Sequence, residues 1–108
     1  MRLYIIRHAD PDYPNNTITP AGHLEAQALA ARMQREKLDR IYSSPMGRAR
    51  DTAKYSADAL TLPVTVEEWT AELSDLRLKD APFEGMMAWD VHGETIRGGE
   101  AMPLHHNW

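Results

Sequence analysis

The sequence has no cysteine, no long hydrophobic run and no excess of positive charge. Without cysteine there can be no disulfide bonds, which fits a reducing cytoplasm. The apolar run at residues 3–6 is too short for a signal-peptide core, and no segment is long enough to span a membrane. A formal net charge of −4 argues against nucleic acid or an anionic membrane as the main partner. We therefore predict a cytoplasmic protein with no nucleic-acid and no membrane partner.

The 108 residues are enough for one modest domain and too few for two comfortable ones. Short apolar runs of β type alternate with segments that begin with a hydroxyl residue and proline, which is a helix-start signal. The predicted elements are a buried strand at Leu3–Ile6, a loop at Asp10–Ile18, a helix at Pro20–Glu36, a strand at Arg40–Ser43, a helix at Pro45–Leu60 and a strand at Pro63–Val66. This alternation predicts an α/β fold with a parallel sheet and right-handed crossovers.

The pattern weakens after Glu67. We expect residues 1–67 to form a βαβαβ core and residues 68–108 to form an irregular, insertion-like segment, with a turn or two of helix within Trp69–Leu78. The last residues, MPLHHNW, contain neither a helix cap nor a closing strand. Three strands and two helices also make a thin core for an α/β layer fold. We therefore expect a single domain that is the N-terminal part of a longer protein, with a bare sheet edge or face that favours a homo-oligomer.

Polar residues gather at the carboxyl ends of the predicted strands, where ligands bind in open α/β sheets. Arg7-His8 follows the first strand, and Ser43-Ser44-Pro45 ends the second. Arg48 falls in the first turn of the next helix, where the helix dipole disfavours a cation unless an anion bridges the two. Arg7 and Arg48 would clamp phosphate, and a neutral His8 would attack it as a nucleophile. The alternative is that Arg48 is an ordinary surface residue and His8 a structural histidine.

Three segments, in order along the chain, carry a resemblance to a known family. Arg7-His8 after LYII resembles the Arg-His-Gly signature of the histidine phosphatase superfamily, also called the phosphoglycerate-mutase-like family. TPAG at residues 19–22 resembles its Leu-Thr-x-x-Gly helix start, and IYSSPMGRARDTA at residues 41–53 resembles its second signature. The resemblance implies the three-layer parallel-sheet sandwich of that superfamily, present here in incomplete form.

The resemblance also implies roles for individual residues. His8 would become transiently phosphorylated, while Arg7 and Arg48 hold the phosphoryl oxygens and stabilise charge as it spreads. Family members use an acidic residue after the third strand as proton donor to the leaving oxygen. Glu72 fits that place better than Glu84. A solvated helix carboxylate is the alternative interpretation of Glu72.

A second histidine of the family's pocket has no convincing counterpart in the sequence. In the family it typically lies in a Ser-His-Gly segment after a long apolar strand. Val91-His92-Gly93 has similar letters but follows no such strand, and nothing follows His105-His106 to complete the fold. Asn16 and Ser44 are further predicted phosphate contacts. Neither a metal nor another cofactor is expected, since no ligand spacing recurs among the histidines and carboxylates.

The first signature reads Arg-His-Ala-Asp, which is more typical of phosphatases in the superfamily, including small protein phosphohistidine phosphatases, than of mutases. We therefore predict phosphomonoester hydrolysis, acting on a small phosphorylated substrate or a phosphoprotein. Two alternatives stay open. One is a phosphate-binding or regulatory module that has lost turnover with the second histidine, and the other is phosphoryl transfer of the phosphoglycerate mutase type.

Overall fold

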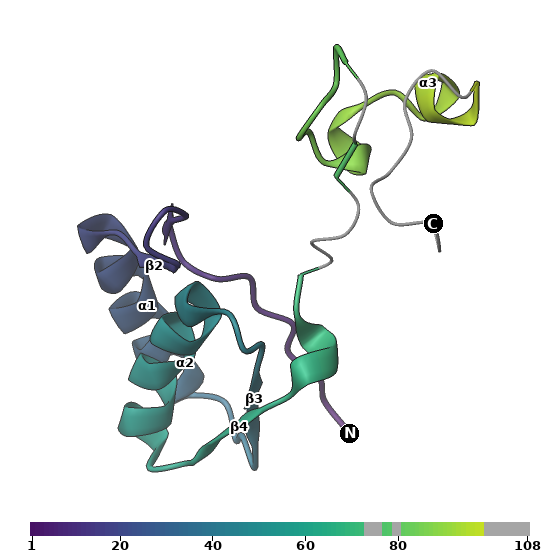
Figure 1. Cartoon of the computed structure of the whole chain (residues 1–108). Helices are drawn as coiled ribbons and strands as arrows, with labels where there is room; N and C mark the ends of the chain where they lie inside the picture. The colour runs from purple at the N-terminus through teal and green to yellow at the C-terminus, as the bar shows by residue number, and fades with distance from the viewer. Residues whose placement is uncertain (73–76, 79–80, 99–108) are drawn as a thin grey trace. The chain divides into compact units, whose positions relative to one another are not determined.

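The computed structural model describes residues 1–72, 77–78 and 81–98, and the chain divides into two compact units (Figure 1). The first unit is Met1–Glu72 and the second is Leu73–Trp108. The boundary lies shortly after the predicted end of the core at residue 67. Each unit is described by itself.

The first unit contains the alternating strands and helices. Its elements are β1 (Pro11–Asp12), β2 (Thr17–Ile18), α1 (Pro20–Met33), β3 (Ile41–Ser43), α2 (Gly47–Leu60), β4 (Val64–Val66) and the 3₁₀ helix η1 (Glu68–Thr70). β3 and β4 pair in parallel, with Ile41 opposite Val64 and Ser43 opposite Val66. The two later predicted strands and the parallel pairing are thus confirmed. The helix between the strands is the α2 crossover that the alternating pattern predicts.

The two helix starts differ in how well the sequence predicts them. Thr19 caps α1, because its Oγ1 accepts a hydrogen bond from the backbone N–H of Gly22 at 3.1 Å, and Pro20 is the first helical residue. α2 begins at Gly47, two residues later than predicted, and its cap residue Met46 makes no side-chain hydrogen bond to the helix. The backbone of Met46 is still extended, with φ −62° and ψ 133°, so the helix cannot begin before it.

The core of the first unit lies between the helices and the segment that precedes them. α1 packs on α2, and α2 packs on β3 and β4, so that both helices lie on the same side of these strands (Figure 1). Ala26 is fully buried beside Ile18 and Ala9, and Tyr55 packs against this cluster. Small residues let the segments approach closely. A Cβ at Gly22 would lie 2.5 Å from the Asp10 carbonyl oxygen, so only glycine fits where α1 passes this segment.

The prediction of a buried strand at Leu3–Ile6 is wrong for this structure. Residues 3–6 belong to no strand, and the side chains of Leu3 and Ile5 are 75% and 89% exposed. A strand is held in a sheet by hydrogen bonds to a neighbour, and among the described residues no strand pairs with this segment. Tyr4 donates a hydrogen bond to the Glu36 carboxylate at 2.6 Å, which holds the side chain but not the backbone.

The predicted loop at residues 10–18 contains a short antiparallel hairpin. Pro11 pairs with Ile18 and Asp12 with Thr17, so β1 and β2 enclose a four-residue turn. Asn16 ends this turn with φ 50°, in the left-handed region that asparagine tolerates better than most residues. The hairpin is fastened to α2 by a 2.5 Å hydrogen bond from Thr17 Oγ1 to the Asp51 carboxylate.

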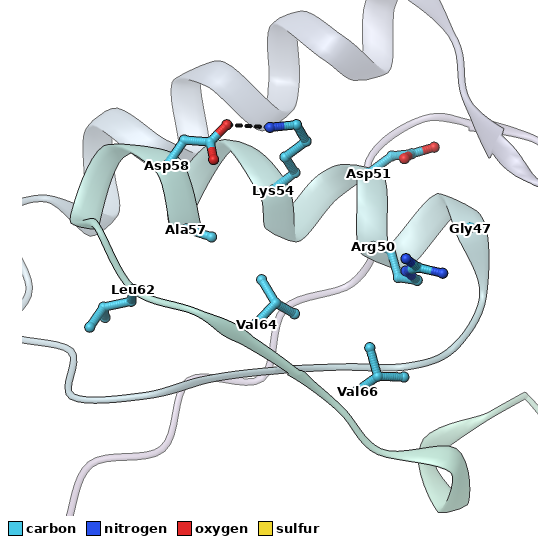
Figure 2. Close-up of a pocket in the computed structure, with 9 residues that line it drawn as sticks. All are labelled: Gly47, Arg50, Asp51, Lys54, Ala57, Asp58, Leu62, Val64 and Val66. Atoms are coloured by element: carbon cyan, nitrogen blue, oxygen red, sulfur yellow. Dashed lines mark hydrogen bonds and ion pairs between the residues drawn. The ribbon is translucent and has the colours of Figure 1, made fainter.

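An open groove of about 580 Å³ runs between α2 and β4 (Figure 2). Val64 and Val66 project from the strand towards the helix, and a 2.6 Å ion pair joins Lys54 to Asp58 on the helix side. The other lining residues are Gly47, Arg50, Asp51, Ala57 and Leu62. None of the residues predicted to bind phosphate lines this groove.

The second unit has a small core of its own. Leu78 and Ala88 are buried, and Phe83, Val91 and Ile96 pack against them. The described residues of this unit include the 3₁₀ helix η3 (Ala88–Asp90) and α3 (Gly93–Arg97), which the sequence pattern did not predict. Of the helix expected within Trp69–Leu78, only the overlap with η1 is seen, and residues 73–76 lie outside the described residues. Within the described parts of the chain, no helix is long and apolar enough to cross a membrane.

Candidate active site

The carboxyl ends of β3 and β4 lead to the two charged residues at the centre of the site. β3 runs through Ser44 into α2, whose second residue is Arg48, and β4 runs through η1 to Glu72. Because the strands are parallel, both connections leave the same edge of the sheet. The Arg48 guanidinium and the Glu72 carboxylate meet there as an ion pair.

Arg48 is buried, with 6% of the residue exposed. Its Nη1 donates to Asn16 Oδ1 at 3.2 Å, its Nη2 pairs with Glu72, and its Cζ lies 5.2 Å from the centre of the Tyr13 ring. Its Nε is buried and has no hydrogen-bond partner among the described residues. A buried cation in the first turn of a helix is unfavourable for two reasons: it has lost its hydration, and the positive end of the helix dipole repels it.

His8 is half-buried and has one ring nitrogen engaged. Nδ1 lies 2.8 Å from the carbonyl oxygen of Ala9. A carbonyl oxygen only accepts, so Nδ1 carries the hydrogen in this bond, and in the neutral imidazole Nε2 is then left with a lone pair. The hydrogen bond thus selects the tautomer that a nucleophilic Nε2 requires.

Tyr13 connects His8 with Arg48. The Tyr13 ring meets the His8 ring edge to face, with centroids 6.2 Å apart and planes at 86°, while the Arg48 guanidinium lies over the same tyrosine. The sequence analysis did not single out Tyr13. The signal that could have found it is an aromatic residue in a proline- and asparagine-rich turn a few residues after Arg7-His8.

The hairpin turn is seated directly on the first residue of α2. A Cβ at Gly47 would lie 2.0 Å from the carbonyl oxygen of Asn16, so only glycine allows this approach. The contact places the Asn16 amide beside the Arg48 side chain, where it accepts the Nη1 hydrogen bond. Asn16 therefore orients Arg48 in this structure.

Asp10 makes hydrogen bonds that hold the backbone next to the site. Its carboxylate accepts a 2.5 Å hydrogen bond from Thr19 Oγ1, and its backbone N–H donates to the Glu25 carboxylate at 2.8 Å. The Asp10 carbonyl also accepts from the Thr19 N–H at 3.0 Å. These bonds tie the segment that carries His8 to the first turns of α1.

The structure brings together only some of the predicted site residues. One connected cluster contains four of them: Asn16 and Glu72 contact Arg48, and Tyr13 lies between Arg48 and His8. Arg7 is exposed, and no hydrogen bond or ion pair joins its side chain to the cluster within the described residues.

The remaining predicted residues lie elsewhere or act locally. Ser44 Oγ accepts from the Met46 N–H at 3.3 Å, and so serves the turn before α2. Glu84 and His92 are exposed residues of the second unit, and His92 stands at the start of α3. His105 and His106 lie outside the described residues. Within the described ranges, no three histidine or carboxylate residues are grouped as metal ligands would be.

Comparison with known proteins gives the same family that the three sequence segments resemble. The model of the histidine phosphatase superfamily (branch 1) matches residues 3–97. A putative phosphoserine phosphatase 2 from Hydrogenobacter thermophilus is 31% identical over 97% of this chain and 55% of its own length. A probable phosphoglycerate mutase from Yersinia pestis is 25% identical over 94% of this chain and 56% of its own. The chain thus spans about half the length of the curated relatives it matches.

Solved structures share the fold. A phosphoserine phosphatase from Entamoeba histolytica, crystallised with 3-phosphoglyceric acid, aligns with a TM-score of 0.57 and 22% identity over 82% of this chain and 46% of that one. A mycobacterial glucosyl-3-phosphoglycerate phosphatase in complex with VO₃ aligns with a TM-score of 0.57 and 21% identity over 85% of this chain and 49% of that one. The described part of the chain is thus a partial α/β fold of the phosphoglycerate-mutase-like type.

Proposed function

Since the chain belongs to the histidine phosphatase superfamily, we propose that it acts in phosphomonoester hydrolysis through a phosphohistidine on His8. The observation that carries this proposal is the buried Arg48, which contacts the same Tyr13 ring as His8, whose Nδ1 hydrogen bond leaves a lone pair on Nε2. An arginine that is desolvated at a helix start, with one nitrogen unpartnered among the described residues, is matched to a ligand with several negatively charged oxygens.

The proposed reaction has two steps. In the first, the Nε2 lone pair of His8 attacks phosphorus, the bond from phosphorus to the leaving oxygen breaks, and that oxygen takes a proton from Glu72. In the second, water attacks the phosphohistidine, its proton returns to the Glu72 carboxylate, and inorganic phosphate leaves with His8 restored. Arg48, and Arg7 once its exposed side chain turns inward, would hold the phosphoryl oxygens through both steps.

The ion pair between Arg48 and Glu72 supports the placement of the acid. Glu72 lies within bonding distance of the residue that would hold the phosphate, and its side chain is 50% exposed, so it can reach a substrate from the solvent side. A phosphoryl group arriving at Arg48 competes with the Glu72 carboxylate for Nη2. Once released from the ion pair, the carboxylate would take up the proton carried by an arriving phosphate monoanion, and the resulting carboxyl group would face the leaving oxygen, where a proton donor is needed.

Hydrolysis is preferred to transfer because of the Arg-His-Ala-Asp signature. The substrate we propose is a small phosphorylated metabolite, in keeping with relatives named for phosphoserine and phosphoglycerate. A phosphoprotein substrate and phosphoryl transfer of the mutase type are the competing outcomes. A phosphate-binding module without turnover is favoured by one observation: the sequence offers no convincing counterpart of the second pocket histidine of the family.

The other expectations from the sequence also stay proposals. We propose that the protein works in the cytoplasm without a cofactor. The large exposure of Leu3 and Ile5 supports a homo-oligomer in which a second copy covers them.

The test is to incubate the chain with an aryl phosphate and to search for acid-labile, base-stable phosphate bound to the protein. We expect the wild type and His23→Ala to carry bound phosphate and His8→Ala to carry none. His23 is the matched control, because it is half-buried like His8 and its Nδ1 is paired with the Tyr55 hydroxyl at 2.9 Å, which is not a predicted phosphate contact. Label retained by His8→Ala, or none in the wild type, would overturn the proposal. Phosphate that binds reversibly, with no covalent phosphate on the protein, would favour the phosphate-binding module.

A further inference from the structure

Thr52 makes two buried hydrogen bonds that link the two halves of the candidate site. It lies on α2 one turn after Arg48 and is 4% exposed. Its Oγ1 accepts from the backbone N–H of Ala9 at 3.0 Å and donates to the carbonyl oxygen of Arg48 at 2.8 Å. The directions are settled by chemistry, since the amide only donates and the carbonyl only accepts. One hydroxyl thus joins the peptide that follows His8 to the helical turn that carries Arg48.

The link matters because the segment before His8 is not held by a sheet. Residues 1–7 are exposed and belong to no strand. Ala9 is the first buried residue along the chain. Its hydrogen bond to Thr52 is also the first that the chain's backbone makes to a helix of the first unit. This bond therefore holds the His8 segment to α2, whereas the hydrogen bonds of Asp10 hold it to α1.

A purely local role for the threonine does not account for both bonds. Threonine in a helix commonly donates to the carbonyl oxygen four residues earlier. That bond does not require the threonine oxygen to accept a hydrogen bond from the protein. Here the acceptor position is taken by an amide from a distant segment, 43 residues earlier in the chain. Without the hydroxyl, this buried amide would have no acceptor at that place, and the segment would have to shift to find one.

We propose that Thr52 is a positioning residue that fixes His8 Nε2 and the Arg48 guanidinium towards one phosphoryl group. The inference rests on the function proposed above. Thr52 does not touch the substrate, and it acts through the backbone on both sides. Reacting groups must be held near their attack geometry, and a displacement of about 1 Å can slow a reaction about 100-fold. We therefore expect loss of the hydroxyl to lower the rate of His8 phosphorylation about 10- to 100-fold.

Two variants separate the hydroxyl from the shape of the side chain. Thr52→Val keeps the branched shape and removes both hydrogen bonds, whereas Thr52→Ser keeps the hydroxyl and removes a methyl group. Ser56→Ala is the matched control, because Ser56 lies one turn later on α2, is 6% exposed, and its hydroxyl has no partner among the described residues. Should the valine variant not fold, Thr52→Ala takes its place.

The experiment has two readouts on the full 108-residue chain. The first is the nuclear Overhauser contact between the rings of His8 and Tyr13, which reports the geometry without any turnover. The second is the rate of phosphate incorporation from an aryl phosphate. We expect Thr52→Val to lose the ring contact and the rate, with Thr52→Ser and Ser56→Ala close to wild type in both.

The outcomes for Thr52 and for the proposed function are distinct. An unchanged ring contact in Thr52→Val would overturn the positioning role, whatever the rate. If the wild type takes up phosphate, an unchanged rate of phosphate incorporation in Thr52→Val would also overturn the positioning role. A wild type that takes up no phosphate would count against the proposed function, while the ring contact would still decide whether Thr52 positions His8.

Discussion

Replacing Arg48 by methionine separates what the guanidinium does for chemistry from what it does for the fold. Methionine has a similar length and no charge. The variant loses the hydrogen bond to Asn16, worth about 1 kcal/mol, the pair with half-exposed Glu72, worth up to about 1 kcal/mol, and the contact with Tyr13, worth about 1 kcal/mol. Together these losses destabilise the fold by about 3 kcal/mol.

The same substitution relieves unfavourable terms of similar size. The unpartnered Nε costs about 1–3 kcal/mol and the repulsion by the helix dipole about 0.3–1 kcal/mol. The net change in the free energy of unfolding is therefore expected within about 2 kcal/mol of zero, because the Glu72 carboxylate that loses its partner is half exposed and stays solvated. Activity, in contrast, should fall about 100- to 1000-fold, the effect of losing one donor to a developing negative charge.

Urea unfolding and hydrolysis of an aryl phosphate measure the two effects in one preparation. The matched control is Arg50→Met, an exposed arginine on the same helix, which should leave both quantities unchanged. A loss of stability above about 3 kcal/mol would mean that Arg48 is chiefly structural, contrary to this reasoning. Activity that survives the substitution would remove Arg48 from the proposed phosphate clamp.

Three further predictions test the framework around the site. Gly47→Ala should destabilise the protein by about 1–3 kcal/mol in urea unfolding, because its Cβ would lie 2.0 Å from the Asn16 carbonyl oxygen; a neutral result would mean that the hairpin is not seated on α2. Thr19→Ala should cost about 1 kcal/mol through loss of the cap to Gly22, seen as a lower thermal midpoint, while Thr19→Ser should recover most of it. Ile5→Ser should reduce self-association in sedimentation velocity if the exposed segment is covered by a second copy, and unchanged association would exclude that segment as the interface.

Local signals predicted the helices and the later strands well. The hydroxyl–proline pair at residues 19–20 marks the start of α1, and the apolar runs before Ser43 and Val66 form the parallel pair. These features depend on a few neighbouring residues, so they can be interpreted from the sequence. The start of α2 was predicted two residues too early, because the chain at Met46 has to stay extended to bring Gly47 beneath Asn16.

The candidate site was predicted in part, and the residues that were missed share a cause. Arg48 and His8 were found because an arginine at a helix start and a histidine after a β-type run conflict with their local surroundings. Tyr13 agrees with its surroundings as a turn residue, so nothing in the neighbouring letters marks it. Thr52 lies within the segment that resembles the second signature, but its place there assigns it no contact. Their importance comes from partners far along the chain, namely Arg48 for Tyr13 and Ala9 for Thr52.

The sequence by itself determined which residues are candidates for the chemistry and where most helices and strands lie, because charge, hydroxyl caps and apolar periodicity are local properties. Only the tertiary structure decided which of these residues meet. It paired Arg48 with Glu72 across 24 residues and left Leu3–Ile6 exposed, since a strand forms only where a partner strand completes its hydrogen bonds. Contacts between distant segments depend on packing as a whole, and no short pattern encodes them.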